Sequence, residues 1–178
     1  MNKILLLLLL TVLSVNFSSA QRVVKNELDK RTNVRYIITN LTDQPHFKEL
    51  KSINKEAGSY LYLQFQTEIS ETIIGNYLNI SLSKLNGRSC IKANAKVVFI
   101  FKDKTELTLK NSELPNCSNY ITAICPISKE DIKKLSTENI ESVTIYTTEG
   151  PEEYFVKSIL RNHSIAAAKL HLEEVSKH

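Results

Sequence analysis

Residues 60–67 read Tyr-Leu-Tyr-Leu-Gln-Phe-Gln-Thr, and residues 77–85 read Tyr-Leu-Asn-Ile-Ser-Leu-Ser-Lys-Leu. In both stretches an apolar residue recurs at every second position and alternates with a polar or amphipathic one. Because successive side chains of a strand point to opposite faces, this alternation predicts two strands of a sheet that buries one face. The two segments therefore indicate a mainly β domain.

Shorter segments of the same kind lie on both sides of this pair. They predict strands at residues 34–39, 95–101, 106–109, 120–127, 142–147 and 153–159. Gly150 and Pro151 are the turn residues that separate the last two. Ser128 is followed three residues later by an acid, Asp131, which is typical of a helix N-terminus. We therefore predict a short internal helix from Ser128 to about Leu135.

The end of the chain changes from strand to helix periodicity. Ile165, Ala168, Leu172 and Val175 form one apolar stripe at helical spacing, with Ser164 before it as a candidate cap. The stripe predicts a terminal helix of about three turns docked on the sheet. The expected fold is a β-sandwich or an open, partly rolled barrel of about eight antiparallel strands, with one short internal helix and a C-terminal helix.

The first twenty residues have the order of a signal peptide. Lys3 precedes an apolar run that continues to Val15, and Ser18-Ser19-Ala20 supplies small residues for a cleavage site. Polar residues return before the run reaches the roughly 20 apolar residues that a membrane-spanning helix needs. We therefore predict cleavage after Ala20, and one secreted or periplasmic β-rich domain over residues 21–178 that does not span a membrane.

The charge pattern argues against nucleic acid as a partner. The formal net charge is +4, and the lysines and arginines are scattered along the chain. No run of them is interleaved with aromatic residues, as a nucleic-acid groove would need.

Three segments resemble a recurring pattern in uncharacterised exported proteins of Bacteroidetes bacteria. They are Lys96-Val-Val-Phe-Ile-Phe-Lys-Asp, Ile127-Ser-Lys-Glu-Asp-Ile-Lys-Lys-Leu and Ile140-Glu-Ser-Val-Thr-Ile, with a Cys-containing loop after the first. The signal peptide, ending Ser-Ser-Ala-Gln, is similar to theirs as well. The resemblance implies a β-rich fold and export, and it carries no activity. Those proteins usually have Asp-Gly at the hairpin turn, where this chain has Asp103-Lys104.

The odd number of cysteines in the exported chain, at positions 90, 117 and 125, allows at most one internal disulfide and leaves one thiol. If Asp103 and Lys104 form a two-residue loop between strands 95–101 and 106–109, opposed positions add up to 207. Ile100 then faces Leu107, and Val98 faces Leu109. The apolar partners match, which supports this register.

Extending the same register outward places Cys90 opposite Cys117. A loop one residue longer would shift the pairing by one and still leave the two cysteines neighbours. Directly opposed residues have Cβ atoms about 4.5 to 5.5 Å apart, close to disulfide geometry. We predict a Cys90–Cys117 disulfide, with Cys125 a free and buried thiol in an apolar strand. The rival pairing is Cys117 with Cys125, which needs the chain to turn back at Asn119.

The histidines near the end of the chain are the candidate metal ligands. His171 and Glu174 are three residues apart on one helix face, and His163 lies nearby in sequence, so the three could bind zinc or copper. The alternative is that they are solvated helix residues beside a frayed terminus. We favour this alternative because a metal site needs supporting ligands that the sequence does not supply. No metal or other cofactor is therefore predicted.

Catalytic motifs do not stand out, because the chain has neither a Gly-x-Ser-x-Gly elbow nor a Ser-x-x-Lys motif with its partners. We expect a non-enzymatic binding or structural module of the cell envelope or extracellular space, with a protein, peptide or glycan as partner. Tyr60, Tyr62 and Phe65 could line a binding face, although cross-strand packing explains them equally well. One alternative is a small hydrolase with a site assembled from distant loops. Another is a lipocalin-like carrier of an apolar ligand, although the chain has no Trp.

Overall fold

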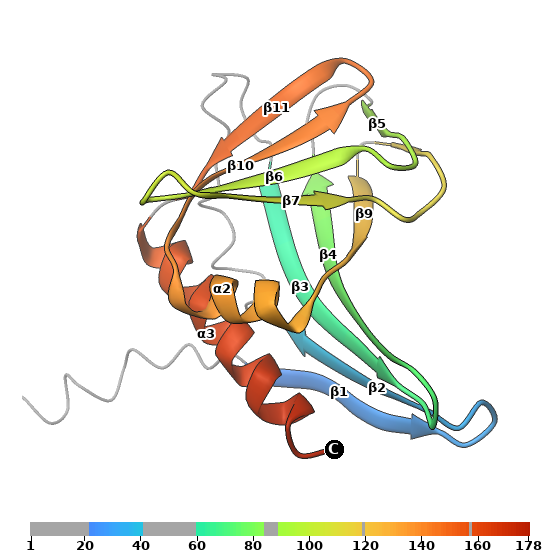
Figure 1. Ribbon diagram of the computed structural model, residues 1–178. Helices are drawn as coiled ribbons and strands as arrows, with labels where there is room; N and C mark the ends of the chain where they lie inside the picture. The colour runs from blue at the N-terminus through green and yellow to red at the C-terminus, as the bar shows by residue number, and fades with distance from the viewer. Residues whose placement is uncertain (1–21, 41–59, 84–88, 119, 157) are drawn as a thin grey trace, which may run out of the picture.

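The computed structural model describes residues 22–40, 60–83, 89–118, 120–156 and 158–178. Within these ranges the predicted mainly β class is confirmed, as five-, four- and two-stranded sheets in which every pair is antiparallel (Figure 1). No closed barrel forms among the described strands, because the two larger sheets each end in edge strands. The arrangement is consistent with a β-sandwich that carries a C-terminal helix.

The five-stranded sheet has the order β1-β2-β3-β4-β9. Its strands are β1 (Arg22–Asp29), β2 (Val34–Asn40), β3 (Tyr60–Ile69), β4 (Ile74–Ser83) and β9 (Tyr120–Pro126). The sequence did not predict β1, because a bulge between Val23 and Lys25 interrupts its alternation.

The four-stranded sheet has the order β11-β10-β6-β7, and a two-stranded ladder of β5 and β8 lies beside it. Its strands are β11 (Gly150–Phe155), β10 (Ile140–Thr147), β6 (Lys96–Phe101) and β7 (Glu106–Lys110), and the ladder pairs β5 (Ser89–Ile91) with β8 (Asn116–Ser118). β5 and β8 have three residues each, too few for a visible alternation. The β10–β11 turn lies at residues 148 and 149, so the predicted turn residues Gly150 and Pro151 instead begin β11.

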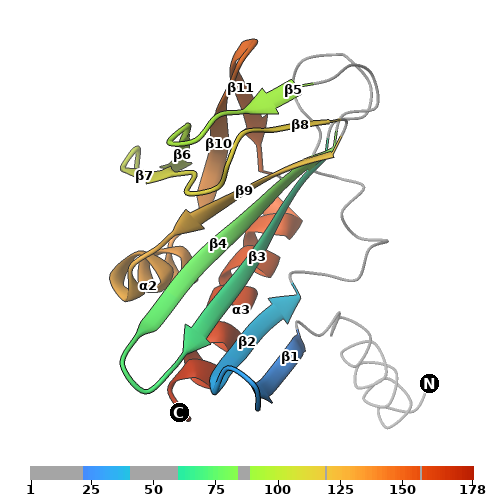
Figure 2. The ribbon, with the colours of Figure 1, turned by 90° about the vertical axis from the view of Figure 1, so that its right-hand side faces the viewer.

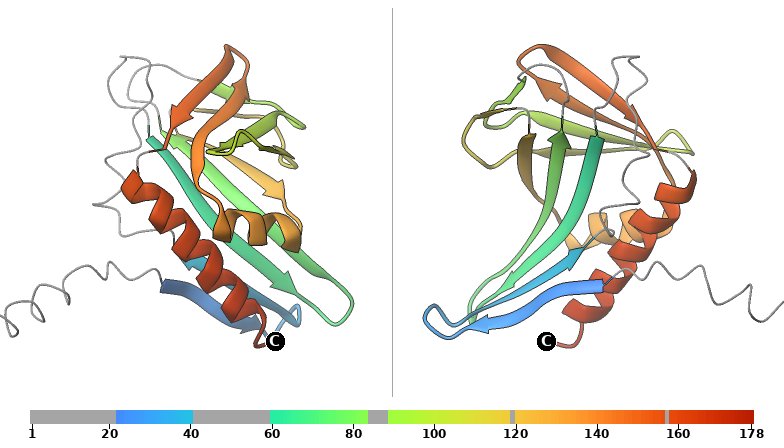
Figure 3. Two further views of the ribbon diagram at one scale, coloured as in Figure 1. Left: turned by 60° about the vertical axis from the view of Figure 1, so that its left-hand side comes forward. Right: turned by 180° about the vertical axis from the view of Figure 1, so that it is seen from behind.

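Both predicted helices are present. α2 (Lys129–Thr137) begins as predicted, since the Ser128 hydroxyl accepts a hydrogen bond from the main-chain N–H of Asp131. α3 (Ser158–Val175) is longer than predicted, and the strand predicted over residues 153–159 ends at Phe155. The helix extends this far because residues 158–175 contain neither Gly nor Pro. Figures 2 and 3 show α3 lying along the concave face of the five-stranded sheet, with α2 beside it.

A single hydrophobic cluster joins both larger sheets to both helices. Its members include Leu63, Phe65, Leu78 and Ile80 from the five-stranded sheet, Val97, Phe99, Phe101, Val143 and Tyr154 from the four-stranded sheet, and Ile132, Leu135, Ala167 and Ala168 from the helices. Phe65 is 1% exposed and belongs to this core. Phe65 therefore does not line a binding face with Tyr60 and Tyr62, and packing, the alternative that the sequence left equally open, accounts for it.

The β6–β7 hairpin has a different register from the predicted one. Its loop has three residues, 102–104, with Lys104 in the left-handed region at φ 68°, and Phe101 N–H bonds the Thr105 carbonyl. Opposed positions consequently add up to 206, and Phe99 faces Leu107. The buried residues of both strands have odd numbers, so only an even sum places them on one face.

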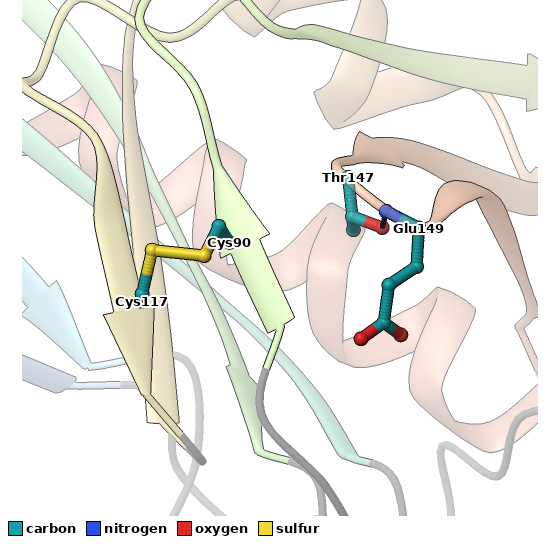
Figure 4. Close-up of a disulfide and its surroundings, with 4 residues drawn as sticks. All are labelled: Cys90, Cys117, Thr147 and Glu149. Carbon is teal, nitrogen blue, oxygen red and sulfur yellow. Dashed lines mark hydrogen bonds between the residues drawn. A yellow bond between two sulfur atoms is a disulfide. The ribbon is translucent and has the colours of Figure 1, made fainter.

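The Cys90–Cys117 disulfide is nevertheless confirmed, and Cys125 is free and buried. In the β5–β8 ladder opposed positions add up to 207, so Cys90 faces Cys117 after the register shifts by one residue between the two ladders. Figure 4 shows the disulfide close to the β10–β11 turn, whose Thr148 N–H donates to the Cys90 carbonyl. The bridge forms because the longer hairpin loop shifts the pairing by only one residue, and the β5–β8 ladder brings the two cysteines back into register.

Candidate functional site

The three candidate metal ligands all lie on α3 but do not converge on one point. His171 faces the sheet, where its Nε2 lies 2.7 Å from Oγ1 of Thr67 on β3. The Glu174 carboxylate accepts hydrogen bonds from Asn26 on β1 and from Lys177. His163 is half-buried about two turns before His171. Among the described residues, no three His, Cys, Asp or Glu side chains are placed to share a metal ion.

His171 is a core residue, so our favoured interpretation of it as a solvated helix residue was wrong. Its side chain is 0% exposed and packs against Phe65, with the ring centroids 5.6 Å apart. Burial lowers the pKa of His171 to about 4, so the ring is neutral at physiological pH. The sequence contained one indication that His171 is buried. The residue falls one turn after Ala168 and next to Leu172, both in the apolar stripe.

The tautomer of His171 follows from the hydrogen bonds around it. Thr67 donates its hydroxyl proton to Oδ1 of Asn76 at 2.7 Å. The hydroxyl can then only accept from His171, so the ring carries its proton on Nε2. Nδ1 of His171 is buried and has no hydrogen-bond partner among the residues that the structure describes.

A row of residues that we call the polar row crosses the concave face where the core ends. It consists of the directly opposed residues Asn26, Ile37, Thr67 and Asn76 of strands β1 to β4. α3 is attached to this row at two points, through the bond between His171 and Thr67 and the bond between Glu174 and Asn26. The helix and the row together close one end of the hydrophobic core.

A second row, which we call the end row, follows two residues farther along each strand. It consists of the directly opposed residues Leu28, Arg35, Ile69 and Ile74. Because side chains two positions apart share a face, the end row lies on the same concave face as the polar row. In Figure 1 the β1–β2 and β3–β4 hairpins project at lower right past both helices. Leu28 is 45% exposed and Ile74 is 62% exposed.

An open pocket of about 490 Å³ adjoins the end row at Ile74. It forms where β9 leaves the edge of β4 and the chain turns into α2. Its walls are Ile74, Gly75, Asn76 and Tyr77 of β4, with Pro126, Ile127 and Ser128 opposite. Ile73, in the adjoining β3–β4 turn, is 68% exposed. Exposed aliphatic surface thus continues from the end row into the turn, and the pocket adjoins this surface at Ile74.

Arg35 is the charged residue of the end row and is half-buried. Its Nη1 donates to Oδ1 of Asn26 at 2.7 Å. Within the described ranges, no carboxylate forms an ion pair with this guanidinium. The end row therefore offers aliphatic surface around a positive charge that has only a neutral partner.

Comparison of the chain with protein-family models, with curated proteins and with solved structures gave no significant match. In the part of the chain that the structure describes, no helix combines the length and apolarity needed to cross a bilayer.

Proposed function

We propose that this protein is an exported, non-enzymatic binding module of the cell envelope or extracellular space, and that the end row is its binding surface. The N-terminal order of basic residue, apolar run and small residues supports export. The Cys90–Cys117 disulfide supports it too, because disulfides persist in oxidising compartments.

The observation that carries the proposal is the order of burial along strands β1 to β4. The side chains pass from the buried core to the polar row and then to aliphatic residues that are again exposed. Single exposed aliphatic residues are ordinary, but large ones gathered at one place mark an interaction surface. Of the seven exposed large hydrophobic residues in the described part of the chain, Leu28, Ile73 and Ile74 lie at this one end.

A protein or peptide fits this surface better than an enclosed small ligand does. Carriers of apolar ligands bury most of the ligand in a cavity, as lipocalins do inside a closed barrel. Here the sheets stay open, and the pocket beside Ile74 is open as well. The support for a glycan face is weaker than the sequence suggested, because Phe65 is buried.

Site-specific photo-crosslinking in the producing cells tests the proposal. A photoreactive residue replaces Ile74 in one variant and Tyr146, which is 44% exposed on β10, in the control. We expect one discrete adduct from position 74, its loss when Leu28→Asp is added, and no such adduct from position 146. Identical adducts from both positions, or none from position 74, would contradict the proposal.

A further inference from the structure

The electrostatics of Arg35 indicate what a partner at the end row carries. Arg35 is half-buried in the end row, where Leu28 on β1 and Ile69 on β3 lie directly opposite it. A guanidinium has five N–H donors, and within the described ranges Arg35 makes one hydrogen bond, to the neutral amide oxygen of Asn26. Removing a charge from water is unfavourable unless an opposite charge compensates it. A carboxylate would supply that charge and accept two of the remaining donors at once.

Two carboxylates beside the end row are already engaged. Glu174, which contacts the polar row, is bound by Asn26 and by Lys177. Asp29 follows Leu28 on β1, so it points to the opposite face of that strand. The Asp29 carboxylate accepts a hydrogen bond from the main-chain N–H of Arg31, and this bond lowers its pKa. Neither group is placed to neutralise Arg35 within the protein.

We propose that the partner docks on the end row through an extended peptide segment in which an acidic residue, flanked by aliphatic residues, pairs with Arg35. This inference rests on the proposed function and adds the chemistry of the partner to it. The choice of occupant follows from charge complementarity. An anion on the partner would pair with a guanidinium that, within the described ranges, has only a neutral partner. The exposed side chains of Leu28 and Ile74, at the two ends of the row, offer apolar contacts.

The dimensions of the row suit a short extended segment. Four neighbouring strands span three spacings, or roughly 14 Å. A segment of five extended residues covers a similar distance in its four residue spacings, at roughly 3.3 to 3.6 Å each. In such a chain the residues two positions before and after the acid point to the same side as the acid. The expected motif is therefore an Asp or Glu with an aliphatic residue two positions away on each side.

The test is a selection from a phage-displayed library of random linear peptides. The exported, disulfide-bonded protein serves as bait, and the Ile74→Asp variant serves for counter-selection. We expect the enriched peptides to carry Asp or Glu in the spacing above. Arg35→Gln should weaken binding of the enriched peptide about tenfold or more, the scale of a charge-assisted hydrogen bond. The matched control Arg31→Gln removes an equal charge from the neighbouring turn and should leave binding unchanged.

A charge-reversal variant keeps the test decisive even if another variant does not fold. Arg35→Glu should lose binding of the acidic peptide and regain binding of the same peptide with Lys in place of its acid. Circular dichroism of each variant confirms that it is folded. If Arg35→Gln is unfolded, Arg35→Lys replaces it, and binding should then fall less than it does in Arg35→Glu.

The outcomes separate this inference from the proposed function. Peptides without an acid, whose binding depends on Ile74 but not on Arg35, would overturn the carboxylate pairing and leave the end row as the binding surface. Peptides whose binding depends on neither residue would overturn both proposals. A selection that enriches nothing over the Ile74→Asp counter-selection would also overturn both.

Discussion

Nε2 of His171 on α3 lies 2.7 Å from Oγ1 of Thr67 on β3, inside the hydrophobic core. The bond joins the C-terminal helix to the middle of the five-stranded sheet. The bond also gives a hydrogen-bond partner to one of the two buried ring nitrogens of His171. A histidine buried in these surroundings favours its neutral form. Protonating the ring at low pH therefore destabilises the fold.

The first prediction concerns that acid sensitivity. Burial lowers the pKa of His171 from 6.5 to about 4, so between these values the unfolded chain binds more protons than the folded chain. Stability is therefore complete above about pH 6.5 and decreases as the pH falls toward 4. We expect a loss of about 3 kcal/mol from this residue over that interval, at 1.36 kcal/mol for each pKa unit. Urea unfolding at several pH values measures the loss.

The His171→Gln variant identifies the source of this loss. Glutamine keeps a hydrogen-bond donor for Thr67 but does not titrate. The difference in unfolding free energy between pH 7 and pH 4 should shrink in this variant. It should persist in His178→Gln, since His178 is exposed. Equal pH dependence in the wild type and His171→Gln would show that His171 is not the titrating group.

Asn111 supports the second prediction, because its amide organises the segment after β7. The side chain is 1% exposed, donates to the carbonyls of Lys92 and Glu113, and accepts from the N–H groups of Glu113 and Ile124. Asn111→Ala removes all four of these part-buried hydrogen bonds, and we expect a loss of about 2 to 4 kcal/mol in chemical denaturation. Asn162→Ala, at an exposed site on α3, should cause no loss. A similar stability of both variants would contradict this role.

The third prediction concerns the disulfide. The bridge closes a separation of 27 residues, which the chain-entropy model relates to about 3 to 4 kcal/mol of stability. The double variant Cys90→Ser, Cys117→Ser should lose about that amount in urea. Non-reducing peptide mapping should recover the Cys90–Cys117 peptide, whereas a linked Cys117–Cys125 peptide would refute the pairing.

The thiol of Cys125 supplies a further check on the pairing in the same preparation. Burial raises the pKa of Cys125 to about 12, so the thiol is protonated and shielded in the folded protein. Iodoacetamide should label it only after denaturation. Rapid labelling of Cys125 under native conditions would contradict its place in the core.

The fourth prediction concerns the β6–β7 loop. Lys104 has φ 68°, a conformation that costs a residue with a side chain roughly 1 kcal/mol relative to glycine. Its Nζ also forms an exposed ion pair with Glu141, a kind of contact that contributes little. In a Glu141→Gln background, Lys104→Gly should therefore raise stability by about 1 kcal/mol. The matched change Lys102→Gly, in the same loop but without positive φ, should bring no gain in thermal denaturation.

The fifth prediction tests export directly. The small residues Ser18 and Ala20 fit a cleavage site, so the exported chain should begin at Gln21. Intact-mass measurement of protein recovered from outside the cytoplasm decides this. A mass that still includes residues 1–20 would show that the segment is not removed.

Local sequence patterns were sufficient to predict much of the fold. Alternation in residues 60–67 and 77–85 located the two central strands β3 and β4, and the Ser128 cap located α2. These signals are local because side-chain direction in a strand and hydrogen bonding at a helix start involve only neighbouring residues. For the same reason the short strands β5 and β8 were missed, since they exist only through their pairing with each other.

The candidate site depended on contacts that no local pattern reports. The sequence identified His171 as a residue of interest, but only the packing of α3 on β3 shows that it is buried against Thr67. The end row was missed entirely, because Leu28, Arg35, Ile69 and Ile74 become neighbours through the registers of three strand pairs.

The hairpin between β6 and β7 illustrates which features the sequence determined and which ones only the tertiary structure decided. The sequence by itself determined that apolar and polar residues alternate in both strands, that residues 1–20 have the order of a signal peptide, and that Cys90 and Cys117 can meet. Tertiary structure alone decided the register, because burying the odd-numbered residues of both strands against one core requires a three-residue loop with Lys104 in the left-handed region. Side-chain alternation is a property of one strand, whereas register and exposure depend on what each face packs against.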